Sequence, residues 1–256
     1  MNGTEYDKAS DIRWLPEVGS TNEALKQAVL GGADIPDGAA WATTRQTAGR
    51  GRRGRSWEMP DGQALALSVW MTGAPDPTAS LLLGLAVTRA LRRLTGADFE
   101  LKWPNDSICG GRKVGGLLCE AICMGGVQGT VLGAGLNLLQ GAEFFKQAGL
   151  PYGGSVRMLT GAEISPRQAA EAVCREWQAI ADRFRAEGFV PFRAEYESVC
   201  ATVGREVRVL NADGTEAFSG TAIGVDETGA LRVQTARAVK TCRAGEVSVR
   251  GLYGYV

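Results

Sequence analysis

The sequence feature that most constrains this chain is a run of arginine and glycine within residues 43–57. Three glycines alternate with the arginines and a tryptophan ends the run; the arginines are Arg45, Arg50, Arg52, Arg53 and Arg55. Arginine is permanently charged and binds phosphate or carboxylate oxygens in pairs. Glycine lets backbone N–H groups come close to an anion. The run therefore predicts a loop that wraps a small, strongly negative ligand.

Other interpretations of the same run remain open. Gly49, Gly51 and Gly54 match the G-x-G-x-x-G dinucleotide fingerprint, but that fingerprint needs a helix directly after it, whereas residues 58–62 read as a turn before a strand. Arginine and glycine runs also bind RNA and single strands. A run of charges is most often a solvated loop, although arginines this close together repel one another unless an anion joins them.

The overall charge favours a small ligand over a nucleic acid. Twenty-eight basic residues balance 28 acidic ones, and the sequence pI is near 6.4. A dedicated nucleic-acid-binding protein usually has a basic excess. The 256 residues, 45% of them hydrophobic and 22% charged, are typical of a globular protein with one full domain and a small companion.

The chain has no histidine, which excludes Ser-His-Asp and Cys-His catalysis, histidine general bases and histidine-containing zinc sites. Its six cysteines include no C-x-x-C pair and predict free, buried thiols in a reducing compartment. The sequence shows no apolar signal core and no uninterrupted apolar stretch of about 18 residues. We therefore expect a cytoplasmic protein without a membrane segment.

The hydrophobic spacing predicts an α/β (α+β) class, with a mixed, largely antiparallel sheet flanked by helices. Strand patterns occur at residues 12–18, 40–44, 64–71, 99–108, 112–122 and 129–138. Helical patterns occur at residues 24–30, 78–94, 166–187 and 190–199. Ser20 or Thr21 is expected to cap the first helix, with Glu23 completing a capping box, and Ser165 to cap the third.

The pattern changes near Thr202. Four or five short strands follow, at 206–210, 216–225, 230–235 and 246–250, separated by turns rich in Asn, Asp and Gly. This spacing predicts a small β-barrel packed against the rest of the protein. We expect a main domain over residues 1–201 and a small β domain over residues 202–256.

Three motifs of polar residues and glycine fall on neighbouring strands of the predicted sheet. They are the arginine run, Lys102–Asp106 together with Arg112–Gly116, and Gly133–Asn137. Lys113 lies in an otherwise apolar strand, and a buried, unpaired ammonium is costly, so it needs an anionic partner. The plainer interpretation is a lysine at the exposed start of a strand. The combination of the three motifs favours a functional site.

In this order the motifs resemble those of the biotin protein ligases, which attach biotin to carboxylase carrier proteins. The resemblance runs from Ile12 onward, and it implies a class II synthetase-like biotin/lipoate ligase fold with a C-terminal SH3-like domain that ends near residues 244–250. The matching segments are Ser20-Thr21-Asn22, Gln46, Gly49–Arg55 with Trp57, Lys102–Asp106, Arg112-Lys113, Gly115-Gly116 and Gly133–Asn137.

The resemblance implies a two-step reaction. Biotin and Mg-ATP form biotinyl-5′-adenylate and pyrophosphate, and a lysine of the biotin carboxyl carrier protein of acetyl-CoA carboxylase, or of another biotin-dependent carboxylase, then attacks the adenylate. Fixed arginine and lysine donors offset the repulsion between the carboxylate and the α-phosphate, and no histidine base is needed. The resemblance implies no DNA or membrane partner, and it is compatible with a homodimer.

The resemblance also assigns residues to each substrate. Those assigned to biotin are Ser20, Thr21, Asn22, Gln46, Arg50, Gly51, Arg52, Lys113, Gly115, Gly116, Gly133 and Gly135. Those assigned to ATP or the adenylate are Arg50, Arg52, Arg53, Arg55, Trp57, Asn105, Lys113 and Asn137.

Four of these positions, together with Asp106, carry specific roles in the resemblance. Lys113 would bridge the biotin carboxylate and the phosphate, which Arg52 would also bind. Asp106 would position or deprotonate the incoming lysine. Trp57 would order the adenine side, and Asn137 would contact phosphate or Mg²⁺. The glycines of the third motif would let the sheet backbone lie close to biotin.

One departure concerns the N-terminus. Some members of the family carry a helix-turn-helix domain there and act as repressors, but only about eleven residues precede Ile12. We therefore expect the form without the DNA-binding domain. The alternatives are a lipoate or other acyl ligase of the same fold and, in a different class, an Arg/Gly nucleic-acid-binding module.

Overall fold

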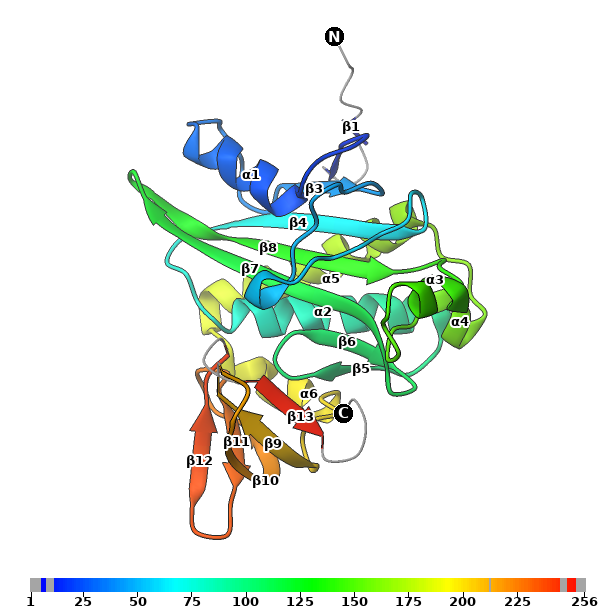
Figure 1. Ribbon diagram of the computed structural model, residues 1–256. Coiled ribbons are helices and arrows are strands. Elements are labelled where there is room, and N and C mark those ends of the chain that lie inside the picture. Colours follow the sequence, from blue (N-terminus) through cyan, green and yellow to red (C-terminus); the bar gives the residue numbers. More distant parts are fainter. Residues whose placement is uncertain (1–5, 8–11, 212, 245–247, 252–256) are drawn as a thin grey trace.

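The computed structural model describes residues 6–7, 12–211, 213–244 and 248–251, which form two sheets (Figure 1). The larger sheet has eight strands in the order β1-β2-β3-β4-β8-β7-β6-β5. Adjacent strands in this sheet are antiparallel, except for β2 and β3, which are parallel. The strands are β1 (Tyr6–Asp7), β2 (Ile12–Trp14), β3 (Ala40–Thr43), β4 (Ala64–Thr72), β5 (Phe99–Lys102), β6 (Asp106–Cys109), β7 (Arg112–Met124) and β8 (Val127–Asn137).

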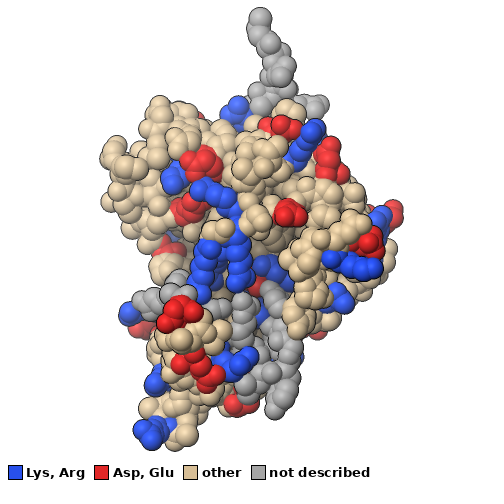
Figure 2. Space-filling model, in the orientation of Figure 1, with Lys and Arg blue, Asp and Glu red and all other residues tan. Residues whose placement is uncertain are grey.

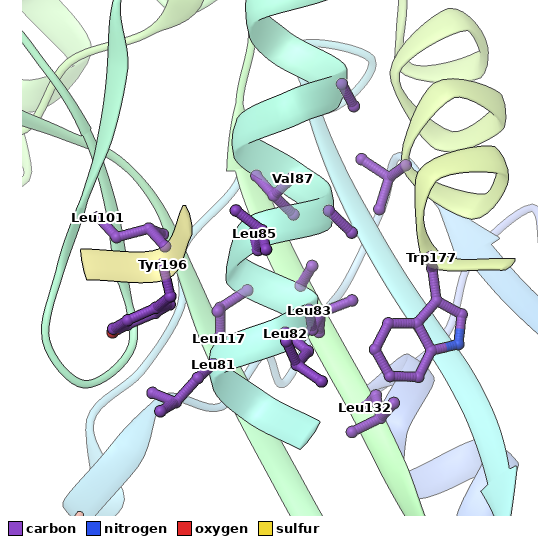
Figure 3. Close-up of a cluster of buried hydrophobic side chains, with 14 of the residues drawn as sticks. Leu81, Leu82, Leu83, Leu85, Val87, Leu101, Leu117, Leu132, Trp177 and Tyr196 are labelled. Atoms are coloured by element: carbon purple, nitrogen blue, oxygen red, sulfur yellow. The ribbon is translucent and has the colours of Figure 1, made fainter. Parts of the chain in front are cut away.

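Helices cover both faces of this sheet, with α1 (Thr21–Leu30) on one face and α2 (Ala79–Thr95) and α5 (Pro166–Glu187) on the other (Figure 1). The leucine-rich face of α2 packs between Trp177 of α5 and sheet residues such as Leu117 and Leu132 (Figure 3). The predicted mixed, largely antiparallel sheet with flanking helices is confirmed. The remaining helices are α3 (Ala142–Gln147), α4 (Val156–Thr160), α6 (Arg193–Ser198) and the 3₁₀ turns η1 (Arg52–Gly54) and η2 (Val190–Phe192).

Capping residues set the helix starts. The Ser165 hydroxyl accepts from the backbone of Gln168, whose side chain completes a capping box with Pro166 at the first helical position. Ser20 accepts from the backbone of Glu23 at the start of α1. The Glu23 carboxylate instead accepts from Gln27 and pairs with Arg50, so the capping box predicted here is wrong.

The smaller sheet has five antiparallel strands in the order β12-β11-β10-β9-β13. Its strand β12 is missing from the prediction because three of its four residues are exposed and show no alternation. The first two residues of the predicted strand 246–250 lie outside the described part of the chain. The strands are β9 (Glu206–Leu210), β10 (Glu216–Val225), β11 (Leu231–Gln234), β12 (Val239–Cys242) and β13 (Ser248–Gly251).

Hydrogen bonds join the small sheet to the main body. The buried Trp103 indole donates to the Gly229 carbonyl at 3.0 Å, and its backbone N–H donates to Thr202 Oγ1 at 3.0 Å. The backbone N–H of Val225 donates to the Glu197 carboxylate at 2.8 Å. Trp103 lies in the turn that divides the predicted strand 99–108 into β5 and β6. A domain boundary between residues 201 and 202 stays a prediction.

All six cysteines are free. Cys109, Cys200 and Cys242 are buried as predicted, whereas Cys123 is exposed at the end of β7, so the prediction of a buried thiol is wrong there. Burial raises the pKa of the Cys119 and Cys174 thiols to about 12, and such thiols are poor nucleophiles.

None of the helices in the described part of the chain has the length and apolar content of a membrane-spanning segment.

Candidate active site

A cavity of about 380 Å³ opens on the face of the main sheet, and all three sequence motifs contribute to its lining. This volume is in the range of small-molecule sites. Val249 of β13 also lines it, so the small sheet reaches the cavity. Lys and Arg side chains gather on this face between the main body and the small sheet (Figure 2). The residues predicted for the site line the cavity, with the exception of Gly115.

The arginine loop crosses the cavity as a tight, self-bonded turn. The Gly51 N–H donates to the Arg55 carbonyl at 2.7 Å, and the Trp57 N–H donates to the Gly49 carbonyl at 2.9 Å. Arg53 occupies the left-handed region with φ 58°, within the 3₁₀ turn. No α-helix follows this turn, because the next described element is strand β4. The dinucleotide interpretation of the glycines is therefore wrong.

Two arginines of the loop are held by other elements. Arg50 pairs with Glu23 of α1 at 2.6 Å and with Glu120 of β7 at 3.5 Å. Arg52 donates to Asn105 Oδ1 at 2.8 Å. Burial, followed by the charge of the neighbouring Arg53, lowers the pKa of Arg52 from its ordinary value. The charged form of Arg52 is disfavoured by burial and by a like charge, so a bound anion would stabilise it.

Lys113 and Asp106 form the charged centre of the cavity. The Lys113 Nζ lies 2.7 Å from Asp106 Oδ1, with 29% and 15% of the two side chains exposed. The predicted anionic partner is thus on the adjacent strand β6, although Lys113 is half-buried and not fully enclosed. Its backbone is clamped by the segment after α3: the Lys113 N–H donates to the Tyr152 carbonyl, and the Gly154 N–H donates to the Lys113 carbonyl.

The opposite end of the cavity, at the start of α1, is lined by the uncharged side chains of Ser20, Thr21, Asn22 and Gln46. The Arg50–Glu23 ion pair beside them has no net charge, so this end is neutral overall. The Thr21 N–H donates to Gln46 Oε1 at 2.8 Å, and the Thr21 hydroxyl lies 3.2 Å from the same oxygen. The Asn22 amide donates to the Leu118 carbonyl at 2.9 Å and to Glu120 Oε2 at 3.0 Å. Both amide hydrogens of Asn22 are therefore engaged, and its oxygen accepts from Ser68 Oγ at 2.6 Å. The second lone pair of that oxygen is what remains for a ligand.

The glycines of the sheet make room for protein side chains. A Cβ on Gly133 would collide with the Asn22 amide, and one on Gly135 would collide with the Trp57 indole. Gly116 faces Trp57 and Lys113, while Gly115 faces Leu136 and the next strand. We expected these glycines to bring the sheet backbone close to biotin; here they seat Asn22 and Trp57 on the cavity floor. The centre of the Trp57 ring lies 5.8 Å from Lys113 Nζ.

Asn137 is buried at the end of β8 beside the charged centre. Its Oδ1 accepts from Gln140 Nε2 at 2.9 Å, which leaves the amide hydrogens for a ligand oxygen. The cavity lining has two carboxylates, Asp106 and Glu58, and Asp106 is paired with Lys113. Among the described residues no three Asp, Glu, Cys or His side chains cluster in a way that could hold a metal ion. The described residues thus do not form a dedicated magnesium site.

Sequence reasoning missed two contributors to this site. Ser68 of β4 is fully buried and contacts Thr21 and Asn22, and Glu120 connects Asn22 to Arg50. A signal for Ser68 was present, because it is the one polar residue within the apolar run 64–71. Buried polar side chains are hydrogen-bonded in folded proteins.

The fold and the cavity define a ligase of the biotin and lipoate type. Residues 16–137 match the biotin/lipoate A/B protein ligase family, and residues 202–250 match the biotin protein ligase C-terminal domain. The chain is similar to the biotin–[acetyl-CoA-carboxylase] ligase of Paracoccus denitrificans, with 33% identity over 93% of this chain and 100% of that protein.

Two further relatives support the same assignment. The bifunctional ligase/repressor BirA of Escherichia coli is 31% identical over 92% of this chain and 73% of that protein. The structure of a biotin protein ligase from Aquifex aeolicus in complex with biotin and ATP has a TM-score of 0.81 at 29% identity, over 94% of this chain and 98% of that one. The chain belongs to the biotin protein ligase family.

Proposed function

We propose that this protein activates biotin with ATP as biotinyl-5′-AMP and transfers the biotinyl group to a lysine of a carrier protein. The observation that carries the proposal is the polarity of the cavity, which is neutral at the Thr21 and Asn22 end and cationic at the Lys113 and Arg52 end. A ligand with a neutral, polar ring at one end and a carboxylate at the other matches this division. The relatives named for biotin ligation support the same substrate.

The neutral end suits the cyclic urea of biotin. Thr21 and Asn22 present oxygen acceptors, and Asn22 has no amide hydrogen left to offer. Gln46 directs its oxygen at Thr21, which leaves its amide hydrogens for a ligand carbonyl. A urea brings both N–H donors and a carbonyl acceptor, so Ser20, Thr21, Asn22 and Gln46 are the residues we assign to this ring.

The cationic end suits the reacting groups. A carboxylate oxygen of biotin attacks the α-phosphorus of ATP, the bond to the bridging oxygen breaks, and pyrophosphate leaves. Both reactants are anionic, so we assign Lys113 and Arg52 to hold them together. Asn137 donates to a phosphate oxygen, and Asn105 keeps Arg52 in place. The exposed Arg53 and Arg55 face the departing pyrophosphate at the cavity rim.

In the second step the carrier lysine attacks the acyl carbon, the bond between that carbon and the phosphate oxygen breaks, and AMP leaves. We assign Asp106 to orient Lys113 and to take the proton of the attacking amine, since its carboxylate is the one bonded to Lys113 in the lining. Trp57 then separates the ring end of the cavity from the nucleotide end.

Magnesium enters in this proposal as part of the substrate Mg-ATP. Mg²⁺ is usually held by substrate phosphates, waters and one or two carboxylates, which agrees with the lack of a carboxylate cluster among the described residues. When bound, the ion neutralises the phosphates and makes pyrophosphate a better leaving group. Among the described side chains, Lys113 and Arg52 are the ones we assign to act on the reactants.

We further propose that the carrier is a biotin carboxyl carrier protein or domain of a carboxylase, as the name of the Paracoccus denitrificans relative states for that enzyme. The six free cysteines support a reducing, cytoplasmic location. A homodimer stays a prediction.

Biotin-dependent exchange of labelled pyrophosphate into ATP tests the proposal. We expect exchange with biotin and Mg-ATP, and none when lipoate or octanoate replaces biotin. Exchange with lipoate would favour an acyl ligase of the same fold. Folded protein without any exchange, combined with salt-sensitive RNA or DNA binding that biotin and ATP cannot displace, would instead favour the nucleic-acid-binding module.

A further inference from the structure

Ser68 is a buried polar side chain in the middle of the apolar strand β4 and has no exposed surface. It lies between Trp41 of β3 and Gly133 of β8 in the register of the sheet. The strand places it under the first turn of α1 and behind the cavity, and it is not part of the cavity lining. A hydroxyl in such a place needs hydrogen-bond partners.

Its partners are two residues of the neutral end. The Ser68 Oγ lies 2.6 Å from Asn22 Oδ1 and 2.7 Å from Thr21 Oγ1. Gly133 has no side chain on the same face, and the Asn22 amide fills that space. Ser68 therefore joins the sheet to both ligand-facing side chains at the start of α1.

These contacts hold both the nitrogen and the oxygen of the Asn22 amide. Its nitrogen donates to the Leu118 carbonyl and to Glu120 of β7, while its oxygen faces Ser68 of β4. The side chain is thus held from two strands: its nitrogen donates to β7, and its oxygen accepts from β4. An amide held in this way cannot rotate to present its nitrogen to the cavity without losing several bonds.

We propose that Ser68 is a positioning residue for the ring end of the substrate. It touches no substrate itself and acts by fixing the directions of the Thr21 and Asn22 oxygens. The single O–H of Ser68 can serve one of the two oxygens, so the other bond is donated by the Thr21 hydroxyl. Without Ser68 the Asn22 oxygen loses its donor, and an unsatisfied buried polar group costs more than a typical hydrogen bond contributes. The side chains then turn to find other partners, and the cavity loses its preset arrangement. The inference rests on the proposed function.

The effect should be confined to one substrate and one kinetic constant. The reacting carboxylate and phosphate lie at the Lys113 and Arg52 end, which Ser68 does not contact. Loss of Ser68 therefore removes binding that the ground state and the transition state share, and such a loss raises KM without lowering kcat. A variant that merely loosened the fold would change kcat and the KM values of both substrates together.

The experiment compares Ser68→Ala and Ser68→Cys with the wild type in the pyrophosphate exchange assay. Cysteine keeps the size of the side chain and replaces the hydroxyl by a weak donor, so it serves if the alanine variant folds poorly. We expect the KM for biotin to rise about tenfold or more, equivalent to the loss of one or two buried hydrogen bonds. We expect kcat and the KM for ATP to stay within about twofold.

Thr130→Val is the matched control. Thr130 is a buried hydroxyl of the adjacent strand β8 without a hydrogen-bond partner, and its removal should leave the KM for biotin unchanged. An unchanged KM for biotin in the Ser68 variants, or a parallel loss in kcat and both KM values, would overturn the inference. An inactive wild-type protein would contradict the proposed function itself, so the two failures are distinguishable.

Discussion

The two ends of the cavity are built from different interactions. At the neutral end, Thr21, Asn22 and Ser68 are buried, and their hydrogen bonds come from two strands. At the charged end, 29% of the Lys113 side chain is exposed, and its ammonium is held by the ion pair with Asp106. Exposed ion pairs are weak, near 0–1 kcal/mol, whereas buried hydrogen bonds are costly to break.

This difference indicates a division of work within one site. The side chains of the neutral end are held by hydrogen bonds within the protein, which suits the selection of one ring over another by hydrogen bonding. The charged end exchanges weak protein ion pairs for contacts with the substrate, which suits a reaction in which charge moves. Removing a cation should therefore affect the rate, while disturbing the neutral end should affect the affinity for biotin.

The largest effect is expected for Lys113→Ala. Without the ammonium, nothing bridges the carboxylate and the α-phosphate, so the rate of adenylation should fall about 100- to 1000-fold while the fold persists. Single-turnover formation of biotinyl-5′-AMP measures the rate, and circular dichroism checks the fold. Lys146→Ala, an exposed lysine of α3, is the control. A normal single-turnover rate in the Lys113 variant would reject the bridging role.

A smaller effect is expected for Arg52→Gly. Loss of the guanidinium should release the adenylate about 10- to 100-fold faster, since hydrogen bonds to charged groups contribute about 1.5–3 kcal/mol. Release of labelled adenylate from the enzyme measures this. Arg237→Gly provides the control, because Arg237 is exposed in the turn between β11 and β12 and does not line the cavity. If the Arg52 variant retained the adenylate as tightly as the wild type, the assignment of Arg52 to the phosphate would be wrong.

The smallest effect is expected from salt. Raising KCl from about 0.1 M to 1 M shortens the Debye length from about 10 to 3 Å, so the KM for ATP should rise severalfold and the KM for biotin should change much less. Steady-state kinetics at a series of salt concentrations give both constants, and sucrose at matched viscosity is the control. A parallel rise in the KM for biotin would mean that the two ends are not distinct.

Much of the fold and of the site was predictable from local pattern. Alternating and helical spacing located β4, α2 and α5, and the Ser165 capping box marked the start of α5. The apolar neighbours of Lys113 in the sequence called for an anion, and Asp106 supplies it, although Lys113 is only half-buried. The three motifs converge on one cavity as expected. The assignments of individual residues to biotin and ATP stay predictions.

Other features depend on contacts between residues far apart in the chain. The glycines at 133 and 135 look like openings for a ligand in the sequence, but Asn22 and Trp57 fill the space above them. Ser68 is an ordinary serine in the sequence until α1 packs over β4 and brings Asn22 within 2.6 Å. Side-chain composition and spacing thus indicate the chemistry of this protein, because arginine and lysine act through their own charge and the absence of histidine excludes histidine catalysis. The direction of each neutral hydrogen bond arises from packing, because it depends on which distant side chain occupies the neighbouring space.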